Sequence, residues 1–211
     1  MDSGETAQWS VPQRDAAAPR DDPAKANVLL GVTGSVAAIR AKILYDALKE
    51  RYNVRVVATK SALNFLETIE GFDPAVVFRD RDEWASWKGV GHAVLHIELR
   101  KWAAAFLIAP LSANTLAKVS NGICDNLLTS IVRAWDHSRP LILAPAMNTL
   151  MWANPLTEKQ LKLCADLMGS YENIIPPIEK KLACGDVGVG AMAEPATILA
   201  HVQSLIAPTS Q

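Results

Sequence analysis

A cysteine beside a glycine-rich stretch is the part of this sequence best suited to chemistry. Cys184 follows two lysines and precedes Gly185, Gly188 and Gly190. Nearby ammonium groups favour a thiolate, and a thiol on such a segment has the profile of a reactive cysteine. Closely spaced glycines disfavour a regular helix or strand, so we expect a substrate flap over about residues 180–194. A glycine-rich surface loop with an incidental cysteine is the alternative.

A second set of polar residues follows four apolar runs, each typical of a buried β-strand. The runs cover residues 27–33, 54–59, 104–109 and 140–144. Helical patterns separate them, which predicts an α/β domain of three layers: a doubly wound, Rossmann-like parallel sheet with helices on both faces.

The carboxyl ends of parallel strands share one edge of the sheet, where such folds bind ligands. We therefore expect four polar clusters to meet there: Gly34 with Ser35, Thr59 with Ser61, Ser112 to Thr115, and Asn148. Backbone amides, hydroxyls and amide side chains, without a metal-ligand set, suit a flat polar ring that carries a phosphate. A dinucleotide fold places an acid after its second strand, so the Thr-Lys-Ser sequence found there favours FMN over NAD. Ordinary tight turns and polar loops are the alternative.

The remaining pattern predicts the domain organisation and several shorter elements. Residues 1–26 contain few bulky apolar side chains and are expected to form a disordered tail, followed by one domain over 27–208. Short strands are expected at 74–78 and 173–175, and helices over 63–69 with Ser61 as a cap, 155–168 and 195–206. The segment 95–102, which includes His96, fits either a strand or a helix, and a lone histidine there is more often structural than catalytic.

Composition excludes several classes of function. The net charge is -1 and there is no dense basic run, so neither nucleic acid nor an anionic membrane is an expected partner. The three cysteines form no CxxC pair, which argues against a zinc site or a disulfide framework and favours the cytoplasm. No apolar run approaches the roughly 20 residues of a membrane span, and the start of the chain lacks the apolar segment of a signal peptide.

Five blocks of the sequence, in order, resemble the phosphopantothenoylcysteine decarboxylase family. This is the eukaryotic branch of the flavin-dependent cysteine decarboxylases, which includes the plant halotolerance proteins, and the likeness covers about residues 27–208. The blocks are Gly34-Ser-Val-Ala-Ala, Val94-Leu-His-Ile-Glu-Leu-Arg, Ala109-Pro-Leu-Ser-Ala-Asn-Thr-Leu, Ala144-Pro-Ala-Met-Asn and Leu182-Ala-Cys-Gly-Asp.

The resemblance implies His96 as the catalytic base, Cys184 as the proton donor, and no metal. It implies a homotrimer with FMN and the active site at a subunit boundary, and phosphopantothenoylcysteine as the small-molecule substrate. The FMN-binding residues that it implies are Gly34, Ser35, Val36, Thr59, Ser61, Ser112, Ala113, Asn114, Thr115 and Met147. The substrate-binding residues that it implies are Asn148, Lys180, Lys181, Leu182, Ala183 and Arg100.

The implied chemistry is FMN-dependent decarboxylation to phosphopantetheine in coenzyme A biosynthesis. Transient oxidation of the thiol-bearing carbon lets carbon dioxide leave, and the enethiol is then reduced again. Two positions depart from the family pattern: Lys101 stands where members often have a second arginine, and Val187 and Val189 stand where plant members have Tyr and Asn. Decarboxylation of a peptide's terminal cysteine, flavin prenylation and an inhibitory subunit of a protein phosphatase are the competing functions.

Overall fold

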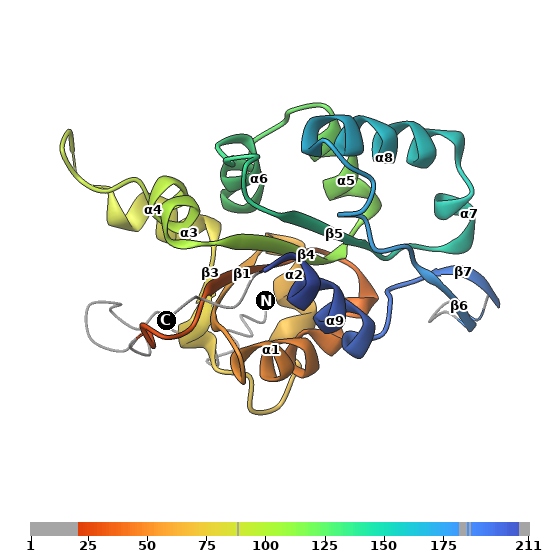
Figure 1. Cartoon of the computed structure of the whole chain (residues 1–211), viewed down its shortest axis with the longest axis horizontal. Coiled ribbons are helices and arrows are strands. Elements are labelled where there is room, and N and C mark those ends of the chain that lie inside the picture. Colours follow the sequence, from red (N-terminus) through yellow and green to blue (C-terminus); the bar gives the residue numbers. More distant parts are fainter. Residues whose placement is uncertain (1–20, 88, 182–184, 186, 207–211) are drawn as a thin grey trace, which may run out of the picture.

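The computed structural model describes residues 21–87, 89–181, 185 and 187–206, arranged around a central sheet (Figure 1). The sheet has five strands in the order β3-β2-β1-β4-β5, and every neighbouring pair is parallel. The order reverses between β1 and β4, as in other Rossmann-like folds. The strands are β1 (Asn27–Val32), β2 (Asn53–Ala58), β3 (Val77–Phe78), β4 (Ala105–Leu111) and β5 (Leu141–Pro145).

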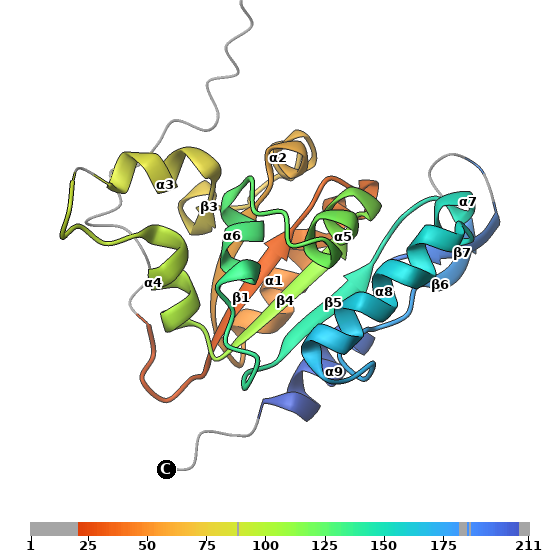
Figure 2. The same cartoon turned by 90° about the horizontal axis from the view of Figure 1, so that it is seen from above.

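Helices cover both faces of this sheet, which confirms the predicted three-layer α/β class (Figures 1 and 2). One face carries the 3-10 helix η2 (Val36–Arg40), α1 (Ala41–Lys49), α2 (Lys60–Leu66) and α9 (Pro195–Leu205). The other carries α4 (Leu95–Trp102), α5 (Ala113–Ser120), α6 (Leu127–Arg133) and α8 (Pro155–Met168). Short helices complete the fold: η3 (Pro74–Val76), α3 (Asp80–Ser86) and α7 (Thr149–Trp152).

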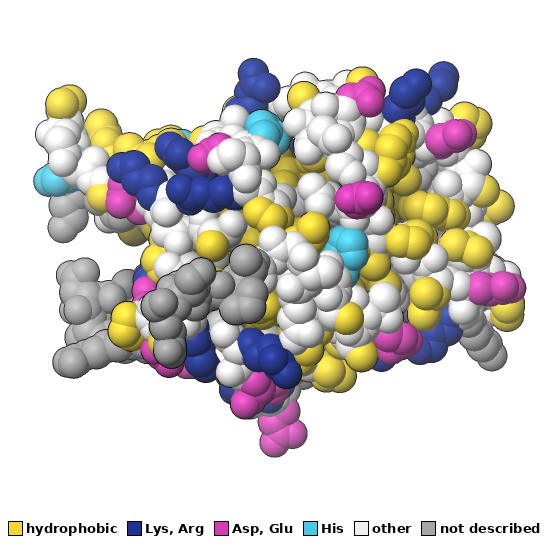
Figure 3. Space-filling model, in the orientation of Figure 1, with side chains coloured by type: hydrophobic (Ala, Val, Ile, Leu, Met, Phe, Trp, Pro, Cys, Tyr) yellow, Lys and Arg dark blue, Asp and Glu magenta, His cyan; other side chains and the backbone are white. Residues whose placement is uncertain are grey.

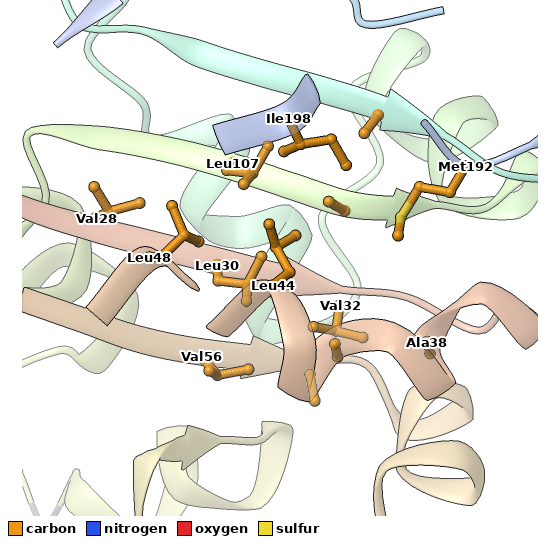
Figure 4. Packing of buried hydrophobic residues seen from close by; sticks show 14 of the residues in the cluster. Val28, Leu30, Val32, Ala38, Leu44, Leu48, Val56, Leu107, Met192 and Ile198 are labelled. Carbon is orange, nitrogen blue, oxygen red and sulfur yellow. The ribbon is translucent and has the colours of Figure 1, made fainter. Parts of the chain in front are cut away.

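Burial of the strands on both sides explains their nearly continuous apolar sequence. Leu29 and Leu30 are adjacent in β1, and each is fully buried in a different core cluster because successive strand side chains point to opposite faces. Figure 4 shows the cluster between the sheet and helices α1 and α9, which includes Leu30 and Leu107 from the sheet, Leu44 from α1 and Ile198 from α9. Because the strand interiors are apolar and buried, polar side chains that could bind a ligand lie at the ends of the strands and in the segments that follow them.

Several shorter predictions are decided by the structure. Residues 95–102 form the helix α4, and the predicted helix 155–168 is confirmed as α8. The expected strand 74–78 is wrong in part, because its first three residues form η3. The expected strand 173–175 is also wrong: in the described chain it contributes an isolated bridge between Leu143 and Ile174. Ser61 is not the cap of α2, which begins at Lys60 after Thr59.

The glycine-rich stretch contains more regular structure than the sequence predicts. β6 (Ile178–Lys181) and β7 (Val187–Ala191) form an antiparallel pair, although the closely spaced glycines were expected to disfavour a regular strand. A Cβ on Gly188 would lie 2.7 Å from Cγ2 of Thr149, and a Cβ on Gly190 would collide with the carbonyl oxygen of Met147. The glycines thus let the strand approach the β5–α7 connection closely, where Met147 N donates to Gly190 O at 2.9 Å.

The described residues that precede β1 pack against the amino edge of the sheet. A carboxylate oxygen of Asp21 accepts hydrogen bonds from Arg55 at 2.9 Å and from the indole of Trp102 at 2.8 Å. The Arg55 guanidinium also lies 4.1 Å from the centre of the Trp102 ring. Of the predicted tail 1–26, residues 1–20 lie outside the described part. Among the described residues, no helix has the length and apolar character needed to cross a membrane.

Candidate active site

A cavity of about 660 Å³ opens at the carboxyl edge of the sheet. Its lining comes from the segments that follow β1, β4 and β5, together with η2 and the strand pair β6–β7. This volume falls within the range of pockets that bind cofactors and small molecules. The lining residues are Gly34, Ser35, Val36, Ala37, Ile39, Arg40, Phe65, Ser112, Ala113, Asn114, Ala146, Met147, Asn148, Met151, Lys180, Gly190, Ala191 and Met192.

A fully buried threonine joins the two strand ends at the centre of this edge. The Thr33 hydroxyl donates to the carbonyl oxygen of Pro110 at 2.7 Å and accepts from the backbone N–H of Ser112 at 2.7 Å. The carbonyl oxygen of Thr33 accepts from the backbone N–H of Ser35 at 2.8 Å. Both serines that line the cavity are therefore positioned by one residue, Ser112 through the Thr33 hydroxyl and Ser35 through the Thr33 carbonyl, and the sequence analysis did not single out Thr33.

The hydroxyls after β2 lie beside the turn that follows β1. An added Cβ on Gly34 would lie 2.5 Å from Cβ of Ser61, so only a glycine permits this approach. The Thr59 side chain is buried, and its hydroxyl has no hydrogen-bond partner among the described residues. A buried donor without a partner costs free energy, so a polar ligand at this position would stabilise it.

Asn148 stands at the rim of the cavity and begins the short helix α7. Its side-chain oxygen accepts from the backbone N–H of Leu150 at 2.8 Å, which fixes the orientation of the amide group. The neighbouring Met147 is 8% exposed and forms part of the cavity wall. The rim thus offers a positioned amide next to an apolar surface.

Two basic side chains at the same rim share one carboxylate. Glu194 Oε2 lies 2.6 Å from Arg40 Nη2, and Glu194 Oε1 lies 3.1 Å from Lys180 Nζ. These partners, Arg40 first, lower the pKa of Glu194 to about 2. The carboxylate is consequently ionised at neutral pH, and it ties η2 to the β6 strand.

His96 lies on a different part of the molecule. Its Nδ1 is 2.7 Å from a carboxylate oxygen of Glu83, whose other oxygen accepts from the His96 backbone N–H at 3.1 Å. Both side chains are partly exposed, at 26% and 16%. Helices α3 and α4 lie at one end of the molecule, and α7 and β7 lie at the other (Figures 1 and 2). Within one chain, His96 does not line the cavity.

The residues of the cavity fit a flavin mononucleotide. The neutral hydroxyls and backbone amides of the lining suit a phosphate and the polar edge of a ring, as does the unpartnered Thr59 hydroxyl next to the cavity. Apolar side chains, among them Val36 and Met147, suit the faces of a planar ring system. In the described residues, no group of three or more His, Cys, Asp and Glu is placed to hold a metal ion.

Comparison with known proteins agrees with this chemistry. Residues 16–207 match the family model described as flavoprotein. A phosphopantothenoylcysteine decarboxylase of Arabidopsis thaliana is 54% identical over 181 residues, which cover 86% of this chain and 85% of that protein. The chain belongs to the phosphopantothenoylcysteine decarboxylase family of flavoproteins.

Two solved structures of similar proteins extend this family assignment. One is a phosphopantothenoylcysteine decarboxylase mutant complexed with pantothenoylaminoethenethiol, 52% identical with a TM-score of 0.78, covering 85% of this chain and 97% of that one. The other is the FMN binding protein AtHal3, 50% identical with a TM-score of 0.78, covering 89% of this chain and 100% of that one. The decarboxylase family thus shares the fold over most of this chain.

The residues that the family resemblance implies fall into three groups in the structure. Those that line the cavity are Gly34, Ser35, Val36, Ser112, Ala113, Asn114, Met147, Asn148 and Lys180. Thr59, Ser61 and Thr115 lie next to it: Thr115 N donates to the Ser112 hydroxyl at 3.3 Å. His96 and Arg100 lie on α4, away from the cavity, and Arg100 Nε is buried without a partner among the described residues. Leu182, Ala183 and Cys184 lie outside the described residues, as does the side chain of Lys181.

Sequence reasoning missed several residues of this decarboxylase-family cavity. The sequence pattern assigned Ile39 and Arg40 only to a helical segment. A single cation within the otherwise apolar run 36–41 is the feature that could have marked Arg40 as a site residue. Phe65 and Met192 gave no signal, because an apolar residue near a cavity has the same sequence pattern as one in the core.

The apolar side chains on the rim of the cavity continue over the surface of the molecule. Figure 3 shows them gathered toward the end that carries α7 and α8. Exposed members on these helices are Leu150, Met151, Leu156, Leu163 and Leu167.

Proposed function

We propose that this chain is an FMN-dependent decarboxylase that converts 4'-phospho-N-pantothenoylcysteine to 4'-phosphopantetheine in coenzyme A biosynthesis. The observation that carries the proposal is the cavity at the carboxyl edge of the sheet, where Ser35, Ser112 and Asn148 converge. Its composition supports a flavin with a substrate beside it. The 54% identity to a phosphopantothenoylcysteine decarboxylase supports this particular substrate.

The residues after β1, β2 and β4 hold the cofactor in this proposal. The N–H groups and hydroxyls of the 34–36 and 112–115 segments bind its phosphate and polar groups, together with Thr59 and Ser61. Val36, Ala113 and Met147 contact its apolar faces. When bound, FMN would supply reversible two-electron chemistry, so that the thiol-bearing carbon of the substrate could be oxidised before carbon dioxide leaves and reduced afterwards, with no net redox change.

The other proposed roles concern protons and the substrate carboxylate. The Asn148 amide donates to the carboxylate and orients it, while His96 accepts a proton from the substrate at Nε2. The hydrogen bond from His96 Nδ1–H to Glu83 keeps Nε2 as the acceptor. Cys184 supplies the proton that completes the product. The remaining residues proposed to contribute to substrate binding are Arg100, Lys180, Lys181, Leu182 and Ala183.

A homotrimer brings the two halves of this site together. Because the α3–α4 arm lies at the opposite end of the molecule from α7 and β7, a second copy must deliver His96 to the cavity. Exposed apolar side chains at both ends support such a contact: Trp84 (77%) and Val90 (103%) at the arm, and Ile39 (52%) and Met151 (48%) at the cavity. We place this assembly in the cytoplasm, where the free thiols of Cys124 and Cys164 would stay reduced.

The function is tested with the purified full-length protein. We expect a yellow protein with a flavin spectrum that releases phosphopantetheine from phosphopantothenoylcysteine. Cys184→Ser should stall the reaction at a product two hydrogens lighter, as measured by mass spectrometry, since the proton that accompanies the returned hydride is missing. A colourless protein that cannot be reconstituted with FMN would contradict the proposed function. Fully reduced product from Cys184→Ser would remove only the role of Cys184.

A further inference from the structure

The charged rim of the cavity combines Lys180, which the family resemblance assigns to substrate binding, with Arg40, which has no role in the function proposed above. Arg40 and Lys180 are the charged side chains among the described residues that line the cavity. The other polar lining groups are neutral: serine hydroxyls, the amides of Asn114 and Asn148, and backbone groups. An anionic part of a ligand would therefore find its strongest electrostatic partner at Arg40 and Lys180.

Glu194 holds this pair in place without neutralising it. Its two carboxylate oxygens each bind one cation, at 2.6 Å for Arg40 and 3.1 Å for Lys180. Two positive charges and one negative charge leave a net charge of +1 at the rim. A guanidinium carries five N–H donors, so the bond to Glu194 leaves others that can reach an incoming anion.

The side chains of the pair are also accessible to a ligand. Their exposed fractions are 30% for Arg40 and 53% for Lys180. They come from separate segments, the end of η2 and the β6 strand, and Glu194 stands at the start of α9. The ion pairs therefore fix the spacing between two cations that the backbone alone would leave independent.

The substrate has one group that matches this site. A phosphate monoester carries a charge between about -1.5 and -2 at pH 7 and prefers the planar donor fork of an arginine. We propose that Arg40 and Lys180, positioned by Glu194, form the subsite for the phosphate of the substrate, an inference that rests on the proposed function. Arg40 and Lys180 then determine that the phosphorylated form of pantothenoylcysteine is preferred over the form without phosphate.

The flavin carries a phosphate of the same chemistry, so the experiment must separate the two sources. The neutral hydroxyls and turn amides near Thr59 and Ser35 are the expected place for the cofactor phosphate. Arg40→Gln should therefore retain the flavin absorbance of the wild type after desalting. Loss of flavin from Arg40→Gln alone would assign the arginine to the cofactor and overturn the inference.

The decisive measurement compares kcat and KM for phosphopantothenoylcysteine and pantothenoylcysteine. Arg40→Gln should lower kcat/KM for the phosphorylated substrate by about 10- to 100-fold, mainly through KM, because a charge-assisted bidentate contact is lost. In the same variant, kcat/KM for pantothenoylcysteine should stay within about twofold of the wild-type value. Arg40→Lys should restore part of the preference. Arg51→Gln, an exposed arginine before β2, is the matched control and should change neither value.

A binding measurement separates this inference from the proposed function. Titration calorimetry with phosphopantetheine and pantetheine should give the same Arg40-dependent preference without any turnover. Binding preference without decarboxylation would overturn the proposed function and leave the phosphate subsite standing. The phosphate subsite would be overturned if Arg40→Gln lost affinity for phosphopantetheine and pantetheine equally. It would also be overturned if the wild type bound both ligands with equal affinity.

Discussion

The cavity at the carboxyl edge of the sheet and the α3–α4 arm (residues 80–102) differ in how their residues are held in place. One chain supplies the whole cavity described here, from strand ends that are held by buried contacts such as those of Thr33 with Pro110 and Ser112. The arm projects from the far end of the molecule and presents His96 on a helix with one fully buried apolar side chain, Leu99. In our proposal one chain therefore supplies most of the residues that bind the cofactor, whereas proton transfer by His96 depends on assembly.

The strongest test of this division uses two inactive variants together. His96→Asn, and Asn148→Asp, which retains the cap oxygen but repels a carboxylate, should each lose at least about 1000-fold in kcat while keeping the flavin. Co-expressed and purified as mixed trimers, they should recover roughly a third of the wild-type sites, because one of the three sites in each mixed trimer combines both intact residues. The measurement is kcat per bound flavin. Mixed trimers as inactive as the separate variants would place His96 and Asn148 in one chain.

A smaller effect is expected from the residue that orients His96. Glu83→Gln keeps a hydrogen-bond acceptor near Nδ1 but removes the charge that stabilises a protonated imidazole, so kcat should fall about 10- to 100-fold. The flavin spectrum should be unchanged, since Glu83 belongs to the arm. Glu98→Gln is the control: Glu98 lies on α4, the helix of His96, where it pairs with Lys101 at 3.1 Å. This variant should retain wild-type kcat. Equal losses in both variants would mean that α4 is merely destabilised.

The packing of the cavity wall is tested at the close contact between Gly190 and the Met147 carbonyl. Gly190→Ala should lower the free energy of unfolding by about 1–3 kcal/mol and reduce flavin content, because the φ of +155° is unfavourable for alanine and the Cβ meets the Met147 carbonyl. Gly169→Ala is the matched control: its φ is +75°, but nothing lies within 4 Å of the added Cβ. It should cost less and leave flavin content unchanged. Urea unfolding and absorbance after desalting measure the two effects.

Much of the fold could be predicted because its signals are local. Continuous apolar runs mark strands that are buried on both faces, and the regular alternation with helices fixes a parallel sheet. The cluster of polar residues at one edge follows from that topology alone, so the sequence predicts that Ser35, Ser112 and Asn148 lie close together.

The parts that sequence could not supply depend on tertiary contacts. The strand β7 forms despite its glycines because Gly188 and Gly190 approach Thr149 and Met147, and no local pattern reveals that packing. The proposed role of Arg40 depends on its contact with Glu194, a residue 154 positions away in the chain. The distance between His96 and the cavity likewise follows from how α4 packs, not from its own sequence.

The attachment of Asp21 to Arg55 and Trp102 has a practical consequence. It anchors the start of the described chain at the amino edge of the sheet, across the domain from the opening that we assign to flavin and substrate. A fluorescent reporter or surface-immobilisation tag fused ahead of that anchor would emerge on the side remote from the ligands. Sensors and affinity matrices made from this enzyme should be built from that end.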